Sequence, residues 1–247
     1  MTNIRLVTAA GIKNAFRLKT GMMILIGVTL ICVVGIALLM CILLIAPEMK
    51  SVVPDRAALE AHLGVILYSS SLISIGVGLN SLVFQTMVRE QARGNLAALM
   101  ATPLKVFDIW LGKSLALFIP GLVIAIVLTV LNLVIINVIY FLPDPGFICN
   151  WQMLVNSLVI LPIMYFFFGM FVHLIGFTAK PVTGNIIAQV FLPVMANLML
   201  QLAIRNVINI NSWQFIVLNL GLAIVLGVII LVLKSRLTPE RVILAAG

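Results

Sequence analysis

Charged side chains are scarce in this sequence, and the long apolar runs contain none. Asp, Glu, Lys and Arg make up 9% of the 247 residues and hydrophobic residues make up 63%, whereas soluble domains have about 25% charged residues. A charge at the centre of a bilayer costs about 2.5 kcal/mol or more, so uncharged runs are typical of membrane spans. The composition excludes an ordinary soluble domain. We expect six spans, at residues 22–46, 63–88, 114–141, 154–177, 186–204 and 213–233.

Residue types that perform chemistry are also few. His62 and His173 are the only histidines and the three cysteines form no CxxC pair, so a metal cluster and a nucleophilic triad are both missing. The one Gly-Lys-Ser sequence, at 112–114, has Phe107 where a phosphate-binding loop needs glycine. We expect no catalytic, cofactor-binding or metal-binding residue, and a chain that is not itself an enzyme.

Six apolar runs of this length fill almost the whole chain. Backbone groups in lipid have to be hydrogen-bonded within their own segment, and the runs lack the alternating polarity of a transmembrane β-barrel. The sequence predicts an all-α membrane protein with a single transmembrane domain over residues 1–247. No separate catalytic domain fits in the remainder.

The positions of the 15 Lys and Arg residues predict the orientation. Four precede the first span, four lie between the second and third, one lies between the fourth and fifth, and three follow the last, which places twelve on one side. The positive-inside rule makes that side the cytoplasm. We expect a multi-pass protein of the cell membrane with both termini cytoplasmic. The net charge of +8 then reflects topology and attraction to anionic lipid, and nucleic-acid binding is not expected because no aromatic base platforms are interleaved.

The segment 2–19 is a candidate interfacial helix ahead of the first span. On a helical wheel Ile4, Val7, Ala15 and Leu18 share one arc, and the basic residues lie elsewhere. We expect an amphipathic helix on the cytoplasmic surface. The alternative is a basic tail that only fixes the topology.

The connection 89–113 is the longest cytoplasmic one and the most patterned. Its middle third predicts a short helix that is capped by Asn95 and ended by Pro103. Leu96, Leu99 and Met100 share one face at spacings of three and four, so we expect an apolar knob that faces outward from the membrane. Such a helix could couple the spans to a partner or lie on lipid head groups, and its spacing alone favours neither.

This connection resembles that of ABC-2 type transporter permeases, which reads R-E-x-E-R-G-T-L-E-x-L-L-x-T-P and is followed by a stretch ending in L-G-K. Ala92, Asn95 and Ala97 depart from the pattern, which weakens electrostatic docking and leaves the apolar part intact. The motif covers about 25 residues, and the six-span layout extends the similarity over the chain. The positions that match in register are Arg89, Glu90, Arg93, Gly94, Leu96, Leu99, Thr102, Pro103, Leu111, Gly112 and Lys113.

The resemblance implies a six-helix permease half that pairs with a second half, as a homodimer or heterodimer, and with two ATP-binding-cassette ATPase subunits on the cytoplasmic face. ATP and Mg would bind to those ATPases and not to this chain. The resemblance also implies transport in the export direction and a coupling helix seated in a groove of the ATPase. The residues it assigns to ATPase coupling are Glu90, Arg93, Gly94, Asn95, Leu96, Leu99, Met100, Thr102 and Pro103.

Two other functions fit a chain of this type. One is a self-sufficient channel or secondary carrier, which would have ionisable groups in the spans or an inverted repeat, and neither is evident. The other is a membrane scaffold or immunity protein that binds a partner without moving a substrate.

Polar side chains within the spans are candidates for a substrate pathway or for contacts between helices. For Ser70, Ser74 and Gly78, which recur every four residues, we favour close helix packing. For His173 we expect a buried neutral side chain bonded to a backbone carbonyl, with proton or substrate sensing as the alternative. Pro162 and Pro193 should kink their spans. The candidates are Ser70, Ser74, Asn80, Asn132, His173, Asn197 and Gln201.

Overall fold

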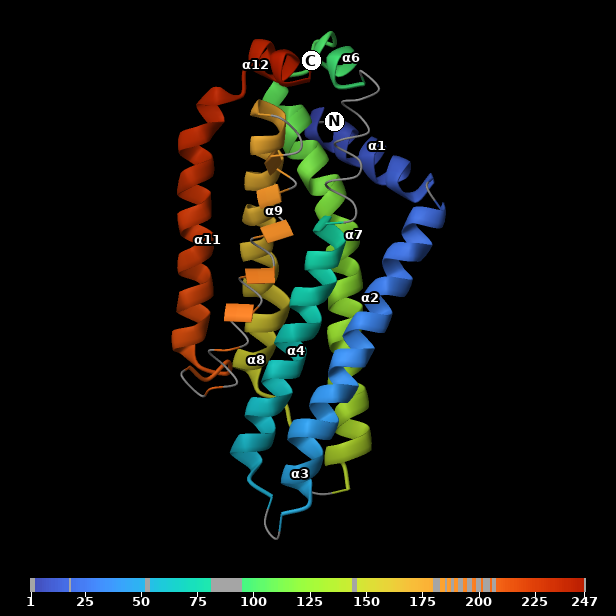
Figure 1. Ribbon diagram of the computed structural model, residues 1–247, viewed down its shortest axis with the longest axis vertical. Helices are drawn as coiled ribbons and strands as arrows, with labels where there is room; N and C mark the ends of the chain where they lie inside the picture. The colour runs from blue at the N-terminus through green and yellow to red at the C-terminus, as the bar shows by residue number, and fades with distance from the viewer. Residues whose placement is uncertain are drawn as a thin grey trace.

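The computed structural model describes residues 3–17, 19–51, 54–80, 95–143, 146–179 and 208–246, together with isolated residues between 183 and 205. Every regular element in these ranges is a helix, and the long helices run side by side as a bundle (Figure 1). The prediction of an all-α protein is therefore confirmed for this part of the chain.

Five helices among the described residues are long and apolar enough to cross a membrane. Three of them contain a π-helical turn, and the last ends in a 3₁₀ turn. They are α2 (Lys19–Met40) with its turn Cys41–Ile45 and α3 (Ala46–Met49), α4 (Arg56–Gly78), α7 (Val106–Ile136) with its turn Asn137–Phe141, α8 (Trp151–Val155) with its turn Asn156–Ile160 and α9 (Leu161–Thr178), and α11 (Trp213–Leu233) with Lys234–Arg236.

Three shorter helices gather at one end of the bundle. They are α1 (Asn3–Arg17), α6 (Asn95–Met100) and α12 (Pro239–Ala246), and Figure 1 shows them together at the top, with both ends of the chain. Helix α9 also ends there, whereas α11 begins at the opposite end. A helix at 2–19 is confirmed as α1.

The helix ends differ from the predicted spans in ways that have local causes. The predicted last span, 213–233, agrees with α11, whose start is capped by Ser212. Helix α4 begins at Arg56, rather than at residue 63 where the second span was expected, because the Asp55 carboxylate accepts a hydrogen bond from the Ala57 amide at 2.9 Å. Hydropathy does not register such polar caps, because they lie outside the apolar run.

Other spans differ from the prediction for other reasons. The helix of the third span, α7, begins at Val106 rather than at residue 114, because a helix can continue beyond the bilayer into water. The π-helical turn Asn156–Ile160 ends two residues before Pro162, so a change in helix type accompanies the proline at which a kink was expected. The predicted fifth span, 186–204, falls mostly on residues outside the described ranges, and Pro193 is one of the isolated helical residues described within it.

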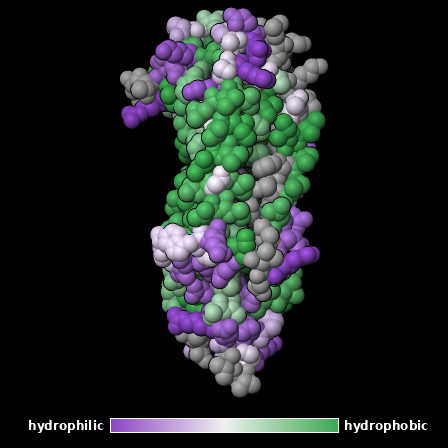
Figure 2. All heavy atoms as spheres, turned by 90° about the vertical axis from the view of Figure 1, so that its left-hand side faces the viewer, coloured by the Kyte–Doolittle hydropathy of each residue, from purple (hydrophilic) through white to green (hydrophobic). Residues whose placement is uncertain are grey.

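Burial divides the spans into a central helix and a lipid-facing periphery. Helix α4 is buried along most of its length, whereas α2 and α11 expose large apolar side chains, including Met23 (74% exposed), Ile31 (71%) and Val232 (68%). Figure 2 shows the result as a hydrophobic belt with hydrophilic residues gathered toward both ends. Apolar side chains exposed at this density would not be stable in water. The chain is a multi-pass helical membrane protein.

Candidate functional site

Helix α6 lies between the second and third spans, at the end of the bundle that also holds α1 and α12 (Figure 1). Thr102 ends the helix, because its hydroxyl and its amide both donate to the Leu99 carbonyl, at 2.6 and 3.2 Å. Pro103 follows and cannot continue a helix. The predicted helix from Asn95 with its stop at Pro103 therefore agrees with the structure.

The apolar side chains of α6 face the bundle rather than the surroundings. Leu99 and Met100 are half-buried and pack against an apolar cluster built from the ends of the neighbouring helices. The outward-facing knob expected from the sequence is wrong for these two residues, because burying an apolar side chain of this size stabilises by about 1.5–3 kcal/mol. The cluster, here called the end cluster, consists of Ile109, Trp110, Met170, Leu174, Phe177, Ile230 and Val242.

The surface that α6 and the turn after it present outward is small and nearly uncharged. Ala98, Ala101, Thr102 and Pro103 are exposed. The backbone of Asn95 and Leu96 is helical, and their side chains lie outside the described part of the structure, as do Glu90, Arg93 and Gly94 in full. A partner that meets the described part of α6 would contact the four small exposed side chains, which we call the ridge of α6.

Helix α1 packs tightly on the start of α7 through two glycines. A Cβ at Gly11 would lie 2.6 Å from the Ala116 Cβ, and one at Gly112 would lie 2.8 Å from the Val7 Cβ. The Thr8 hydroxyl also bonds to the Gly112 carbonyl at 3.2 Å. Gly112 belongs to the Leu-Gly-Lys part of the sequence motif, and the close approach of α1 is the physical reason for a glycine there.

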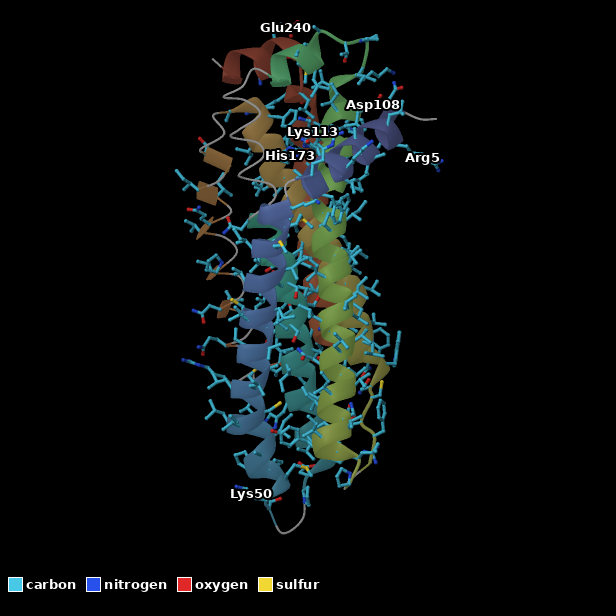
Figure 3. All side chains as sticks on the ribbon, turned by 90° about the vertical axis from the view of Figure 1, so that its right-hand side faces the viewer. Arg5, Lys50, Asp108, Lys113, His173 and Glu240 are labelled. Atoms are coloured by element: carbon cyan, nitrogen blue, oxygen red, sulfur yellow. The ribbon has the colours of Figure 1, made fainter. Side chains whose placement is uncertain are left out.

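Figure 3 shows Lys113 and His173 close together at this end of the bundle, with Arg5 on the outer side of α1. His173 is 2% exposed, and its Nδ1 lies 2.7 Å from the Ser114 hydroxyl, which donates to the Trp110 carbonyl at 2.8 Å. The expected burial agrees with the structure. The partner differs, because a serine one helix away competes successfully with the backbone carbonyls of α9, which are already bonded within their helix.

The small-residue face of α4 lies against α7. Ser70 accepts a hydrogen bond from the Asn132 amide at 2.8 Å, and Ser74 bonds to the Ser70 carbonyl at 2.7 Å. Near the end of α4, a Cβ on Gly78 would lie 3.0 Å from the Gly121 Cα. The structure thus brings Ser70, Ser74 and Asn132 together in a helix interface.

Three other candidate residues do not join this interface. Asn80, Asn197 and Gln201 are exposed, and the Gln201 side chain accepts a hydrogen bond from Arg205 one turn away. They form no common site with Ser70 and Asn132 in the described part of the molecule.

Two buried asparagines were missed by the sequence reasoning. Asn219 on α11 accepts from the Tyr68 hydroxyl of α4 at 2.9 Å, and the Asn156 amide donates to the Ile210 carbonyl at 3.2 Å. Each stands in an apolar run, which is a usable signal because an amide in lipid needs a partner. By contrast, the buried Tyr165 hydroxyl has no hydrogen-bond partner among the residues that the structure describes.

The described residues contain no group of three or more His, Cys, Asp or Glu side chains that could hold a metal ion. In comparisons with known proteins, no family model, curated protein or solved structure matched the chain. The functional argument therefore depends on the geometry of the helices and on the sequence motif.

Proposed function

We propose that this chain is the membrane-spanning permease subunit of an ATP-binding-cassette transporter of the ABC-2 type, which exports its substrate. A second permease half and separate ATPase subunits complete the transporter. The observation that supports the proposal best is the position of α6, a short helix between two spans that packs on the ends of several other helices.

The packing of α6 suits it to transmit force. Leu99 and Met100 pack against the end cluster, whose members come from α7 (Trp110), α9 (Phe177) and α12 (Val242), among others. A rigid push on the exposed ridge would reach these helices together, because closely packed side chains transmit displacement rather than absorb it. Docking of an ATPase on the ridge and tightening of the ATPase dimer would then tilt the spans between inward and outward access.

The surface composition is consistent with a protein partner at this end. The exposed positions Ala98, Ala101, Thr102 and Pro103 let another backbone approach closely. In this proposal the ATPase contacts the exposed ridge of α6 rather than its leucine face, which was the contact expected from the sequence. The leucine face instead transmits the motion to the helices beneath it. The ATPase binds ATP and Mg, and the spans of the permease form the route that the substrate takes through the membrane.

Purification from the native membrane tests the proposal. A tagged wild-type chain should elute with a subunit that hydrolyses ATP in the presence of Mg. Ala98→Glu places a charge on the ridge and should remove that activity, whereas Ala9→Glu, the same change at an exposed alanine of α1, should retain it.

Two results would reject the proposal. One is an eluate that contains the folded chain and no ATP hydrolysis. The other is retention of the same activity by Ala98→Glu and wild type, which would show that the ridge does not bind the ATPase.

A further inference from the structure

A cavity of about 550 Å³ opens between α1 and α7, and it is closed at the sides by α6 and α9. Its volume lies within the range of about 300–1,000 Å³ that is typical of small-molecule sites. Most of its wall is apolar and comes from side chains such as Leu6, Leu104, Ala116 and Leu117. We call it the α1–α7 pocket.

The polar part of the wall is basic. Lys13 and Arg17 of α1 and Lys113 of α7 all line the pocket, together with the Asn14 amide and His173. None of the described lining residues is acidic. An occupant with a negative head and an apolar body would match both parts of this wall.

The depth of the pocket matches the head-group layer of a membrane. The span Val106–Phe141 has 36 residues, which is about 54 Å of helix, whereas the hydrocarbon core is about 30 Å thick. A centred span therefore extends about 12 Å beyond the core at each end. Lys113 lies about 10 Å along the helix from Val106, close to the boundary between head groups and acyl chains.

We propose that the α1–α7 pocket binds the head group and first acyl carbons of one anionic phospholipid from the leaflet around this end of the bundle. The phosphate lies among Lys13, Arg17 and Lys113, and the acyl chain lies along Leu6 and Leu117. A phospholipid is favoured over a soluble anion because most of the wall is apolar and lies at membrane depth. This inference does not depend on ATP-driven transport.

Bound lipid would also stabilise the contact of α1 with the bundle. Helix α1 touches α7 through the Gly11 and Gly112 positions, and Lys13 and Arg17 of α1 lie on the pocket side of that contact. A phosphate between Lys13 on α1 and Lys113 on α7 would join the two helices electrostatically.

Native mass spectrometry of the purified chain tests the inference, with phosphatidylglycerol and phosphatidylcholine of identical acyl chains as the probes. We expect one phosphatidylglycerol to bind in preference to phosphatidylcholine. Lys13→Ala and Lys113→Ala should each weaken its apparent affinity by about fivefold, the loss typical of one cation near an anionic lipid. Arg5→Ala removes an exposed charge of the same helix that does not line the pocket, and it should have no effect.

A second pair of variants tests the cavity itself. Ala10→Trp fills the pocket without changing its charge and should abolish the bound phosphatidylglycerol, whereas Ala9→Trp, the same change one residue away and outside the lining, should not. Equal binding of the two lipids, or equal effects of Ala10→Trp and Ala9→Trp, would overturn the proposal. Displacement by glycerol phosphate as effective as by phosphatidylglycerol would also overturn it, since the site would then be one for a soluble anion.

Discussion

Gly112 offers a sharp test of how α1 is attached to the bundle. The substitution Gly112→Ala would place a Cβ 2.8 Å from the Val7 Cβ and 3.1 Å from the Ile4 carbonyl oxygen, whereas ordinary contacts begin at 3.4 Å. Neither atom is the far end of a flexible side chain, so α1 itself has to move. The movement would also lengthen the Thr8–Gly112 hydrogen bond, which is already 3.2 Å long.

Two opposing effects determine the size of the change. Overpacking costs about 1–3 kcal/mol, whereas replacing glycine by alanine in a helix gains about 1 kcal/mol. Gly221→Ala on α11 is the matched control, because its Cβ would meet nothing within 4 Å. The difference between the two variants isolates the crowding, and we expect Gly112→Ala to be the less stable by about 1–3 kcal/mol.

The assay is reversible denaturation in mixed micelles, which gives the free energy of unfolding of each variant. A cysteine at Ala15, which is 5% exposed, reports the position of α1 through its rate of maleimide labelling in a background without native cysteines. Labelling should be faster in Gly112→Ala than in Gly221→Ala. Equal unfolding free energies and equal labelling rates would refute the close contact between α1 and α7.

Three further predictions concern the helix contacts. Tyr68→Phe removes a buried hydrogen bond and should cost about 1 kcal/mol of unfolding free energy. Tyr165→Phe removes a hydroxyl that has no partner within the described part of the chain, so it should be neutral or stabilising, and equal losses in micelle denaturation would contradict this. A double-mutant cycle of Ser70→Ala and Asn132→Ala should give a coupling energy of about 0.6 kcal/mol, and additive effects would show that their bond contributes nothing. Leu99→Ala should raise amide exchange in α6 about fivefold while α4 and α9 keep their protection, because about 1 kcal/mol of burial is lost, and unchanged exchange would argue against docking on the end cluster.

Hydropathy was sufficient to predict an all-helical chain with several spans, because lipid selects strongly against charge. The run 213–233 agrees with α11 residue for residue, and the helix at 2–19 is confirmed as α1 within a few residues. The errors occurred where polar groups decide a helix end. Asp55 caps α4 outside the apolar run, so a hydropathy window could not find the start at Arg56.

Orientation of side chains was harder to predict than helix positions. The spacing of Leu96, Leu99 and Met100 identifies a shared face and does not say what that face contacts. Trp110 and Phe177 are separated from α6 along the chain, and only the fold brings them against it. The partner of His173 was missed for the same reason, since Ser114 lies on another helix.

Site-specific cross-linking from the exposed ridge of α6 tests the central claim most directly. A photoreactive amino acid replaces Ala98 in the native cell membrane, and the same residue at Ala9 is the control. The account predicts that the probe at Ala98 captures an ATP-binding-cassette ATPase subunit and that the probe at Ala9 does not. Labelling of Ala98 from outside the cell, or capture of lipid alone at Ala98, would contradict it.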